Sequence, residues 1–359
     1  MVSETLVNDL QLPSGPIGGP AAWKGREMDR ERNLWLHTFT PSEIEEIDAA
    51  VRQHFTEGRE IVDISPATFP LPSLTRKLEI LLEELINGRG FFVLRGFPVE
   101  RYSTVEAAVA YLGIGSYLGS FRSQNTKGHV LGHVCNLGLD IRKPTTRYYQ
   151  TNSELDFHCD SADVVGLLCL RTGKSGGESR IVSAVTVHDE MFRHSPALWR
   201  QLFNAFPTDR RGQIPQGMLP WYDLPLFSWY AGRLTVHASE FVFRAQETLP
   251  QVRRLTDAER EAFAFMKVLC NDPEFHLNMD FRPGDIQFLY NHHVLHSRTE
   301  FEDWPEPERR RHLLRLWLSP PGDRALPPAF SQRFGSVIPG QRGGIDPSGT
   351  KLTFVHEPQ

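Results

Sequence analysis

Short apolar runs broken by Gly, Pro and Asp fill most of the chain after about residue 118. They include "LDFHCD", "VVGLLCL", "SRIVSA", "RLTVHA", "DIQFLYN" and "HLLRLWL". Runs of this length at modest spacing are typical of short antiparallel strands. Many such strands in one chain predict a sandwich or a barrel, so we expect a β-rich core.

Helical patterns precede and interrupt these strands. "TPSEIEEIDAAVRQHF" opens with a Thr/Ser cap and acidic residues, and "SLTRKLEILLEELING" closes with Asn-Gly; both carry apolar residues at helical spacing. A third pattern is "STVEAAVAYLGIG". Two helical insertions are expected among the strands, near 186–206 and 256–271, the second with a Thr cap and an acidic first turn.

The predicted organisation is one domain between two irregular ends. Residues 1–22 are rich in Gly and Pro and predict a flexible arm. A single domain follows over 23–335, with a helical N-terminal layer at about 40–118 and a β-rich core at about 90–320. The Gly, Pro and Ser content of 336–359 predicts an irregular tail.

Charge and cysteine content exclude several classes of function. The net charge of −5 and pI near 6.3 argue against a nucleic-acid-binding protein, which needs clustered Lys and Arg. The four cysteines form no CxxC pair, so we expect buried free thiols in a reducing cytoplasm. The apolar runs are too short to span a bilayer, and no signal-peptide pattern opens the chain.

Metal-binding residue types alternate in "ELDFHCDS". If this segment is a strand, its side chains point alternately to two faces. The polar face would then carry Glu154, Asp156, His158 and Asp160, and the other face Leu155, Phe157 and Cys159. We therefore expect Cys159 to pack in the core.

His158 and Asp160 offer two corners of a facial triad, which needs one more imidazole from elsewhere. Taken alone, the HxD pattern would equally suit a surface pair or a hydrogen-bonded pair.

Arginines share one predicted face of the last strand. Alternation places Arg311 and Arg315 on the same face as Leu313 and Trp317. Two guanidinium groups on an otherwise apolar face need an anion. The alternative is a salt bridge to a Glu, which suits Arg309 or Arg310 better.

Three further segments occur in a recognisable order: "SGGESRIVSA", "RPGDIQFLYNHHVLHSRTEF" and "RRRHLLRLWLSP". With the HxD pair, the chain resembles the Fe(II)- and 2-oxoglutarate-dependent dioxygenases of the taurine dioxygenase-like (TauD/TfdA) superfamily over roughly residues 90–330. The resemblance implies an α+β or mainly β fold: a double-stranded β-helix (jelly-roll, cupin-like) core with flanking and inserted helices, so that 23–335 is a catalytic domain.

The resemblance also implies the iron ligands. His158 and Asp160 correspond to the first two, and His296 to the third. His292 and His293 compete for the third position, but the spacing from Asn291 favours His296.

Co-substrate contacts are implied in the same way. Arg315 corresponds to the arginine that clamps the distal carboxylate of 2-oxoglutarate in a bidentate fork. Arg311 resembles a second anion-binding arginine near the co-substrate or substrate. Ser179 stands where many relatives carry a Thr that hydrogen-bonds the co-substrate.

The implied reaction uses Fe(II), 2-oxoglutarate and O2. Oxidative decarboxylation of 2-oxoglutarate to succinate and CO2 is coupled to hydroxylation, desaturation or ring closure of a small organic substrate. The presence of Asp160 distinguishes the chain from related halogenases, which lack this carboxylate. The rival interpretations are a cupin-type metalloenzyme independent of 2-oxoglutarate and a catalytically silent binding protein.

Substrate contacts are expected just upstream of the metal strand. The candidates are Tyr148, Tyr149, Asn152, Glu154, Asp156 and Asn291. An acidic pair, Glu154 and Asp156, would suit an amine-bearing substrate. Either carboxylate could instead orient a ligand His or lie exposed. The expected partner is a small molecule, not a nucleic acid or a membrane, and the chain could form a homo-oligomer.

Overall fold

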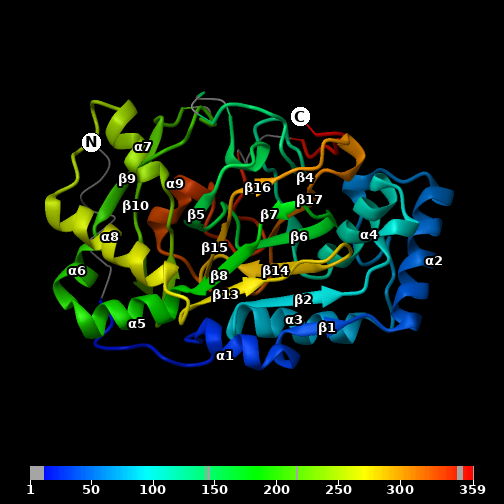
Figure 1. Ribbon diagram of the computed structural model, residues 1–359, viewed down its shortest axis with the longest axis horizontal. Coiled ribbons are helices and arrows are strands. Elements are labelled where there is room, and N and C mark those ends of the chain that lie inside the picture. Colours follow the sequence, from blue (N-terminus) through cyan, green and yellow to red (C-terminus); the bar gives the residue numbers. More distant parts are fainter. Residues whose placement is uncertain (1–11, 142, 144–145, 216, 346–350, 359) are drawn as a thin grey trace.

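Two β-sheets form the centre of the computed structural model, which describes residues 12–141, 143, 146–215, 217–345 and 351–358 (Figure 1). The larger sheet has seven strands. In order they are β1 (Leu36–Thr38), β2 (Phe91–Arg95), β14 (Ile286–Tyr290), β6 (Val164–Arg171), β17 (His312–Ser319) and β3 (Ser120–Phe121), with β4 (Leu131–Val134) also paired to β17. β1 and β2 pair in parallel, and the other neighbours pair antiparallel.

The smaller sheet has four antiparallel strands. They are β13 (His276–Met279), β8 (Ser179–Ser183), β15 (Val294–Arg298) and β5 (Leu155–His158). One apolar cluster joins the sheets: Val165 and Trp317 of the larger sheet belong with Ile181 and Leu277 of the smaller. Inward-facing residues of two antiparallel sheets make the core of a jelly roll. The predicted fold class is confirmed.

Helices cover the outer face of the larger sheet, as the N-terminal patterns predicted. They are α2 (Pro41–Glu57), α3 (Thr75–Asn87) and α4 (Thr104–Ser116). Thr40 and Glu43 form the capping box that starts α2, and Gly58 ends the helix at φ 62°. Ile47 and Leu112 of this layer pack in one cluster with Leu316 of β17.

A second group of helices covers the outer face of the smaller sheet. They are α5 (Ala184–His194), α6 (Pro196–Gln201) and α8 (Asp257–Asn271). The capping box of Thr256 and Glu259 starts α8, as predicted. The first insertion, predicted near 186–206, contains two helices, because Pro196 lacks an N–H and starts a new helix.

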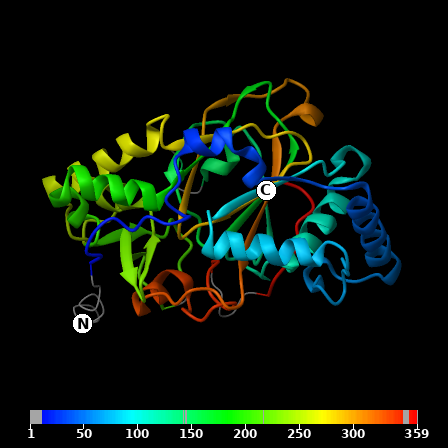
Figure 2. The same cartoon turned by 90° about the horizontal axis from the view of Figure 1, so that it is seen from below.

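In Figure 1, α5, α6 and α8 lie to the left of the sheets and α2 and α4 to the right, while α3 lies below β2 and β14. The perpendicular view in Figure 2 also places α2 and α5 on opposite sides of the sheets. The remaining helices are α1 (Gly25–Arg30), α7 (Phe241–Thr248) and α9 (Ser331–Phe334). Two-stranded antiparallel pairs complete the described strands: β9 (Ala205–Asp209) with β10 (Trp221–Pro225), β11 (Phe227–Tyr230) with β12 (Arg233–Val236), and β7 (Ser175–Gly176) with the distant β16 (Phe301–Glu302).

Both irregular ends are tied to the domain where they are described. In the N-terminal segment, the backbone N–H groups of Ile17 and Gly18 donate to the carboxylate of Asp189; residues 1–11 of the predicted arm lie outside the described residues. In the C-terminal segment, Arg342 is fully buried and forms ion pairs with Asp163 (2.8 Å) and Asp323 (2.7 Å). Within the described ranges, the helices are too short or too polar to cross a membrane.

Candidate active site

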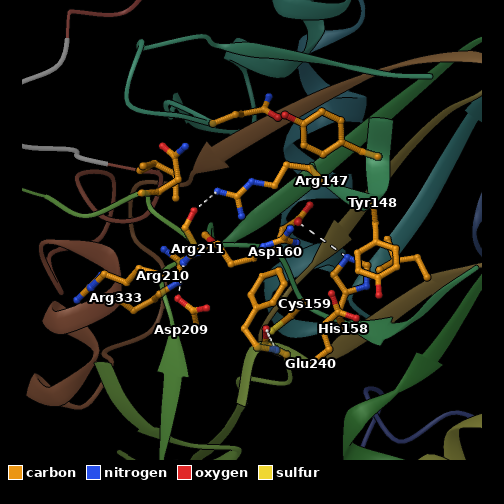
Figure 3. Close-up of a pocket in the computed structure, with 18 of the residues that line it drawn as sticks. Arg147, Tyr148, His158, Cys159, Asp160, Asp209, Arg210, Arg211, Glu240 and Arg333 are labelled. Carbon is orange, nitrogen blue, oxygen red and sulfur yellow. Dashed lines mark hydrogen bonds and ion pairs between the residues drawn. The ribbon is translucent and has the colours of Figure 1, made fainter. Parts of the chain in front are cut away.

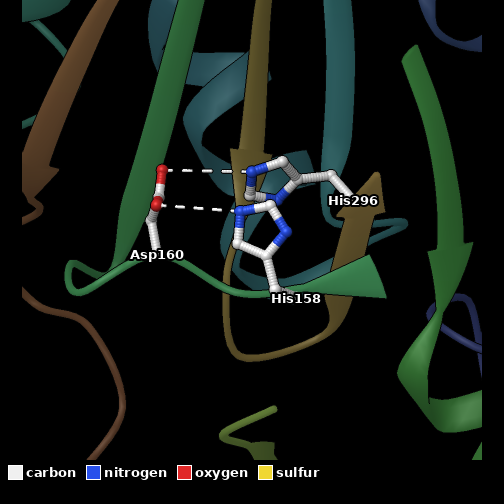
Figure 4. Close-up of side chains that lie close together, drawn as sticks. All are labelled: His158, Asp160 and His296. Carbon is white, nitrogen blue, oxygen red and sulfur yellow. Dashed lines mark ion pairs between the residues drawn. The ribbon is translucent and has the colours of Figure 1, made fainter. Parts of the chain in front are cut away.

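Two histidines and one aspartate converge at the edge of the smaller sheet (Figure 4). His158 ends β5, and its direct partner across the ladder is His296 of β15. Asp160 Oδ1 lies 4.0 Å from His158 Nε2, and Asp160 Oδ2 lies 3.9 Å from His296 Nε2. The three possible ligand atoms all lie within 4.8 Å of one another, close enough to bind one metal ion.

Asp160 reaches this position by a different route from the one predicted. β5 ends at His158, so strand alternation does not place Asp160. Instead, the backbone N–H of Asp160 donates to Asn291 Oδ1, and the side chain of Asn291 donates to the carbonyl of Ala162. The turn after β5, held by an asparagine that follows β14, brings the carboxylate back towards the imidazoles.

The residues around His158, Asp160 and His296 set the protonation states of these three side chains. Burial would raise the pKa of Asp160, but Arg315 and the two histidines lower it to about 2. Burial lowers the pKa of His158, and burial with the neighbouring charge of His158 lowers that of His296 to about 3. At neutral pH the group therefore presents two neutral imidazoles and one carboxylate.

The tautomer of His158 follows from its contacts. Its Nδ1 lies 2.9 Å from the carbonyl oxygen of Asp156, which can only accept a hydrogen bond. Nδ1 therefore carries the proton, and Nε2 offers its lone pair on the side of Asp160.

Cys159 points away from this group, as predicted. It belongs to the buried apolar cluster behind the smaller sheet, and its Sγ lies 3.5 Å from the carbonyl oxygen of Ala238. Burial raises the pKa of the thiol to about 12, so the sulfur is protonated and unsuited to metal binding.

The two competing histidines face elsewhere. His292 Nε2 lies 2.8 Å from Asp163, and His293 Nε2 contacts Arg324. Asp163, His292 and Asp323 form a second close group, but Arg342 already pairs with both carboxylates. A buried cation fills the place that a metal ion would take.

The predicted co-substrate residues lie at two places. Arg315 contacts the metal-binding group directly, with Nη1 3.3 Å from Asp160 Oδ1, and its Nε donates to Gln124 Oε1 over 2.8 Å. Arg311 precedes β17 and is buried; it donates to the carbonyl of Gly177. Ser179, buried at the start of β8, stands two residues from that glycine.

A cavity of about 170 Å³ opens beside the metal-binding group (Figure 3). His158, Asp160 and Arg315 line it, together with Tyr148, Tyr149 and Asp156. Asn152, Glu154 and Asn291 do not. Asn152 donates to the carbonyl of Phe301, Glu154 pairs with Arg180 outside the cavity, and Asn291 holds the turn of Asp160.

Both members of the predicted acidic pair already have a cationic partner. Asp156 lies at the edge of the cavity but forms an ion pair with Lys267 over 2.6 Å. Glu154 and Asp156 are each paired by a cation at the surface.

Several cavity residues were missed from the sequence. Trp317 donates its indole N–H to Asp160 over 3.0 Å, and its place beside Arg315 on the predicted strand face was a signal for this contact. Gln124, Arg147, Arg210, Arg211 and Arg333 also line the cavity. They come from loops, from the end of β9 and from α9, where no local pattern pointed to a common site.

A jelly roll that carries two imidazoles and one carboxylate at one site defines the class of non-haem Fe(II) oxygenases. The family model described as "Taurine catabolism dioxygenase TauD, TfdA family" matches residues 53–317, and the chain belongs to that family. It is therefore an Fe(II)- and 2-oxoglutarate-dependent dioxygenase.

Similar proteins span most of the chain. FR-33289 synthase of Streptomyces rubellomurinus is 27% identical over 325 residues, which cover 90% of this chain and 96% of that protein. Taurine hydroxylase-like protein SAT17 of Stachybotrys chartarum is also 27% identical, over 86% of this chain and 83% of that protein.

A solved structure of asparagine oxygenase with Fe(II), 2S,3S-3-hydroxyasparagine and succinate has a TM-score of 0.62. It is 18% identical and covers 79% of this chain and 93% of its own. At this identity the likeness supports the fold.

Proposed function

We propose that His158, Asp160 and His296 hold the Fe(II) ion of this dioxygenase. The observation that carries the proposal is the convergence of their ligand atoms within 4.8 Å. The donor set also fits, because two neutral imidazoles and one ionised carboxylate leave three positions of an octahedral ion free. Bound there, Fe(II) couples decarboxylation of 2-oxoglutarate to oxidation of the substrate.

The side chains around this site fix the donor atoms. The carbonyl of Asp156 orients the ring of His158 through its Nδ1–H. Asn291 holds the backbone of Asp160, and Trp317 donates to its carboxylate. These contacts keep the donors of His158 and Asp160 in place without a metal, which lowers the cost of binding one.

We further propose that Arg311 binds the distal carboxylate of 2-oxoglutarate. Arg311 is only 4% exposed, and its Nη1 has no hydrogen-bond partner among the described residues. Buried donors of this kind need an acceptor. Arg298 lies over the same Phe301 ring as Arg311, at 4.9 and 5.1 Å, so two buried cations stand close together. Asp303 lies near both and accepts the backbone N–H of Arg311, but it is one carboxylate for two guanidiniums, which favours a further anion beside them.

This proposal revises the predicted clamp by Arg315. Arg315 donates to Gln124 and contacts Asp160, so part of its hydrogen-bonding capacity is already used. We assign it to the iron end of the site, where it steadies the ligand carboxylate. Ser179 keeps its predicted role as a hydroxyl donor near Arg311.

An anaerobic titration tests the proposal. Metal-free protein receives Fe(II) and then 2-oxoglutarate, and the weak visible charge-transfer band of a chelated keto acid is recorded. We expect the band in the wild type and in Cys159→Ser, and its loss in Asp160→Ala. Fe(II) binding without the band would favour a metalloenzyme that does not use 2-oxoglutarate.

Two expectations about the whole protein stay predictions: a cytoplasmic location and a possible homo-oligomer. Fractionation of cells and light scattering of the purified protein test them.

A further inference from the structure

The cavity beside the iron site carries an excess of arginines. Five line it: Arg147, Arg210, Arg211, Arg315 and Arg333. In Figure 3, the labelled Arg210, Arg211 and Arg333 lie on the opposite side of Asp160 from His158, and the guanidinium of Arg147 points towards them. They come from the segment before Tyr148, from the end of β9 and from α9, so the fold assembles them from three distant parts of the chain.

Carboxylates of the cavity do not balance these charges. Asp209 forms an ion pair with Arg244 over 2.8 Å, outside the set. Burial raises the pKa of Glu240 and the charge of Arg211 opposes this, so Glu240 and Asp209 partly neutralise Arg211. Asp156 pairs with Lys267, and Asp160 belongs to the metal group.

Three of the arginines form no ion pair with a carboxylate within the described ranges: Arg147, Arg210 and Arg333. Arg147 donates to the carbonyl of Arg211, and Arg210 to the carbonyls of Leu219 and Gln332. The Nε of Arg333 is buried and has no hydrogen-bond partner among the described residues. Carbonyl oxygens accept hydrogen bonds but do not neutralise charge, so the cations remain uncompensated.

The electrostatics of Arg147 reflect this crowding. Burial lowers its pKa to about 10, and nearby positive charges of Arg211, Arg333 and Arg315 add to the effect. A guanidinium in that position is stabilised by any anion that enters the cavity.

Two of the arginines also lie over aromatic rings. The Cζ of Arg210 lies 4.9 Å from the Tyr222 ring, and that of Arg211 lies 5.0 Å from the Phe241 ring. Arg211 has a positive φ of 52°, a conformation that costs energy in a residue with a side chain, and Asp209 accepts its backbone N–H over 2.7 Å. A strained backbone that aims a cation into a cavity is typical of a binding site.

We propose that the substrate carries a doubly charged tetrahedral oxyanion, of the phosphate monoester or phosphonate type, and that Arg147, Arg210, Arg211 and Arg333 bind it. Planar guanidiniums bind such oxygens through paired hydrogen bonds. The rings of Tyr148, Phe157 and Trp317 line the same cavity and contact the carbon part of the substrate. Because it names the substrate class of the same site, this inference rests on the proposed function.

The test compares two ligands of one shape and different charge. Methyl phosphate and methyl sulfate are titrated by calorimetry at pH 7.5 into anaerobic protein that holds Fe(II) and saturating 2-oxoglutarate. We expect methyl phosphate to bind at least about ten-fold more tightly, because its second acid group titrates near pH 6. The same titration with methylphosphonate at pH 8.5 then shows whether the site binds the phosphate ester or the phosphonate more tightly.

Variants assign the binding to the arginines. Arg147→Gln and Arg333→Gln should each weaken methyl phosphate binding at least about ten-fold, and Arg147→Lys by less, because lysine keeps the charge but loses the fork. Arg76→Gln is the matched control, since Arg76 is 79% exposed on α3 and pairs only with Glu79 there. Equal binding of the two ligands, or unchanged binding in both glutamine variants, would overturn the inference.

The charge-transfer band of the same samples separates this inference from the proposed function. A band without binding of methyl phosphate overturns the substrate class alone. Binding that depends on Arg147 in a protein without the band supports the anion site and overturns the 2-oxoglutarate assignment.

Discussion

Trp317 donates its indole N–H to Asp160 Oδ2, the same oxygen that faces His296 across 3.9 Å. The other oxygen of Asp160 contacts Arg315, and its backbone is held by Asn291. Asp160 is therefore fixed by side chains of β17 and of the turn after β14, although it lies outside any strand itself. Contacts of this kind orient a ligand and tune its affinity for the metal.

Replacement of Trp317 by Phe should weaken Fe(II) binding by about 10- to 100-fold. The aromatic body stays, but the hydrogen bond that orients Asp160 is lost. Anaerobic titration against a coloured chelator measures the affinity. Trp35→Phe is the control, because Trp35 is equally buried but donates to the carbonyl of Met28. Equal affinity in both variants would show that the indole hydrogen bond does not position the ligand.

Substitution of Arg311 should weaken the binding of 2-oxoglutarate, whereas substitution of Arg315 should weaken the binding of Fe(II). Arg311→Gln should raise the KM for 2-oxoglutarate by about 10- to 100-fold, since a charge-assisted hydrogen-bond pair is lost. Arg315→Gln should mainly weaken Fe(II) binding, because Arg315 contacts Asp160. Steady-state rates of succinate formation and the metal titration separate the effects. Arg310→Gln, at an exposed arginine next in the chain, is the control. A rise in KM with Arg315→Gln alone would restore the clamp predicted from the sequence.

Local patterns in the sequence were enough to predict some of this structure. The helices that start at Thr40 and Thr256 were predicted because a capping box is a short-range signal that needs no partner elsewhere. The thiol of Cys159 packs in an apolar cluster, as predicted, although Cys159, like Asp160, lies beyond the end of β5 at His158. The His158, Asp160 and His296 group depended on family resemblance, since His296 stands far along the chain.

Long-range contacts escaped prediction. Asp160 was expected on the strand, but its position depends on Asn291, 131 residues away. The arginines of the cavity are brought together only by the packing of β9 and α9 around the site. Arg342 lies in a segment whose Gly and Pro content predicts irregular structure, and the backbone of that segment is irregular. The side chain of Arg342 is nevertheless held in place by ion pairs with the buried Asp163 and Asp323, which the sequence does not reveal.

Loss of Arg342 should strongly destabilise the fold. Its side chain is fully buried between Asp163 and Asp323, so Arg342→Met leaves two buried carboxylates without their cation. Breaking a buried pair in this way costs about 3–5 kcal/mol. Urea unfolding measures the change in the free energy of unfolding. Arg76→Met, at an exposed ion pair, should cost less than about 1 kcal/mol. A similar small effect for Arg342→Met would show that the C-terminal segment does not support the core.

The contribution of Asp163 should depend on pH. Burial would raise its pKa, but the hydrogen bond from His292 and the charges of His292 and Arg342 lower it below the ordinary value of 3.8. A carboxylate with a lowered pKa in the folded state stabilises the protein above the pKa of the unfolded state, and this stability is lost as the pH falls. Asp163→Asn should therefore destabilise the protein fully at pH 6 and progressively less below about pH 4. Urea unfolding across this range measures the difference, and a penalty that stays constant or grows in acid would contradict the assignment.

Asp160 and Cys159 are neighbours in the turn after β5, and substitution of each should affect activity and stability differently. Asp160→Ala should abolish iron-dependent turnover, because it removes the only carboxylate of the proposed ligand set. Cys159→Ser should keep most activity and cost about 1–2 kcal/mol, because it places a hydroxyl in an apolar cluster, where the carbonyl of Ala238 offers one acceptor. Substrate-dependent succinate formation and urea unfolding measure the two effects on the same samples. An inactive Cys159→Ser protein with an intact fold would mean that the thiol takes part in the reaction and is not a core residue alone.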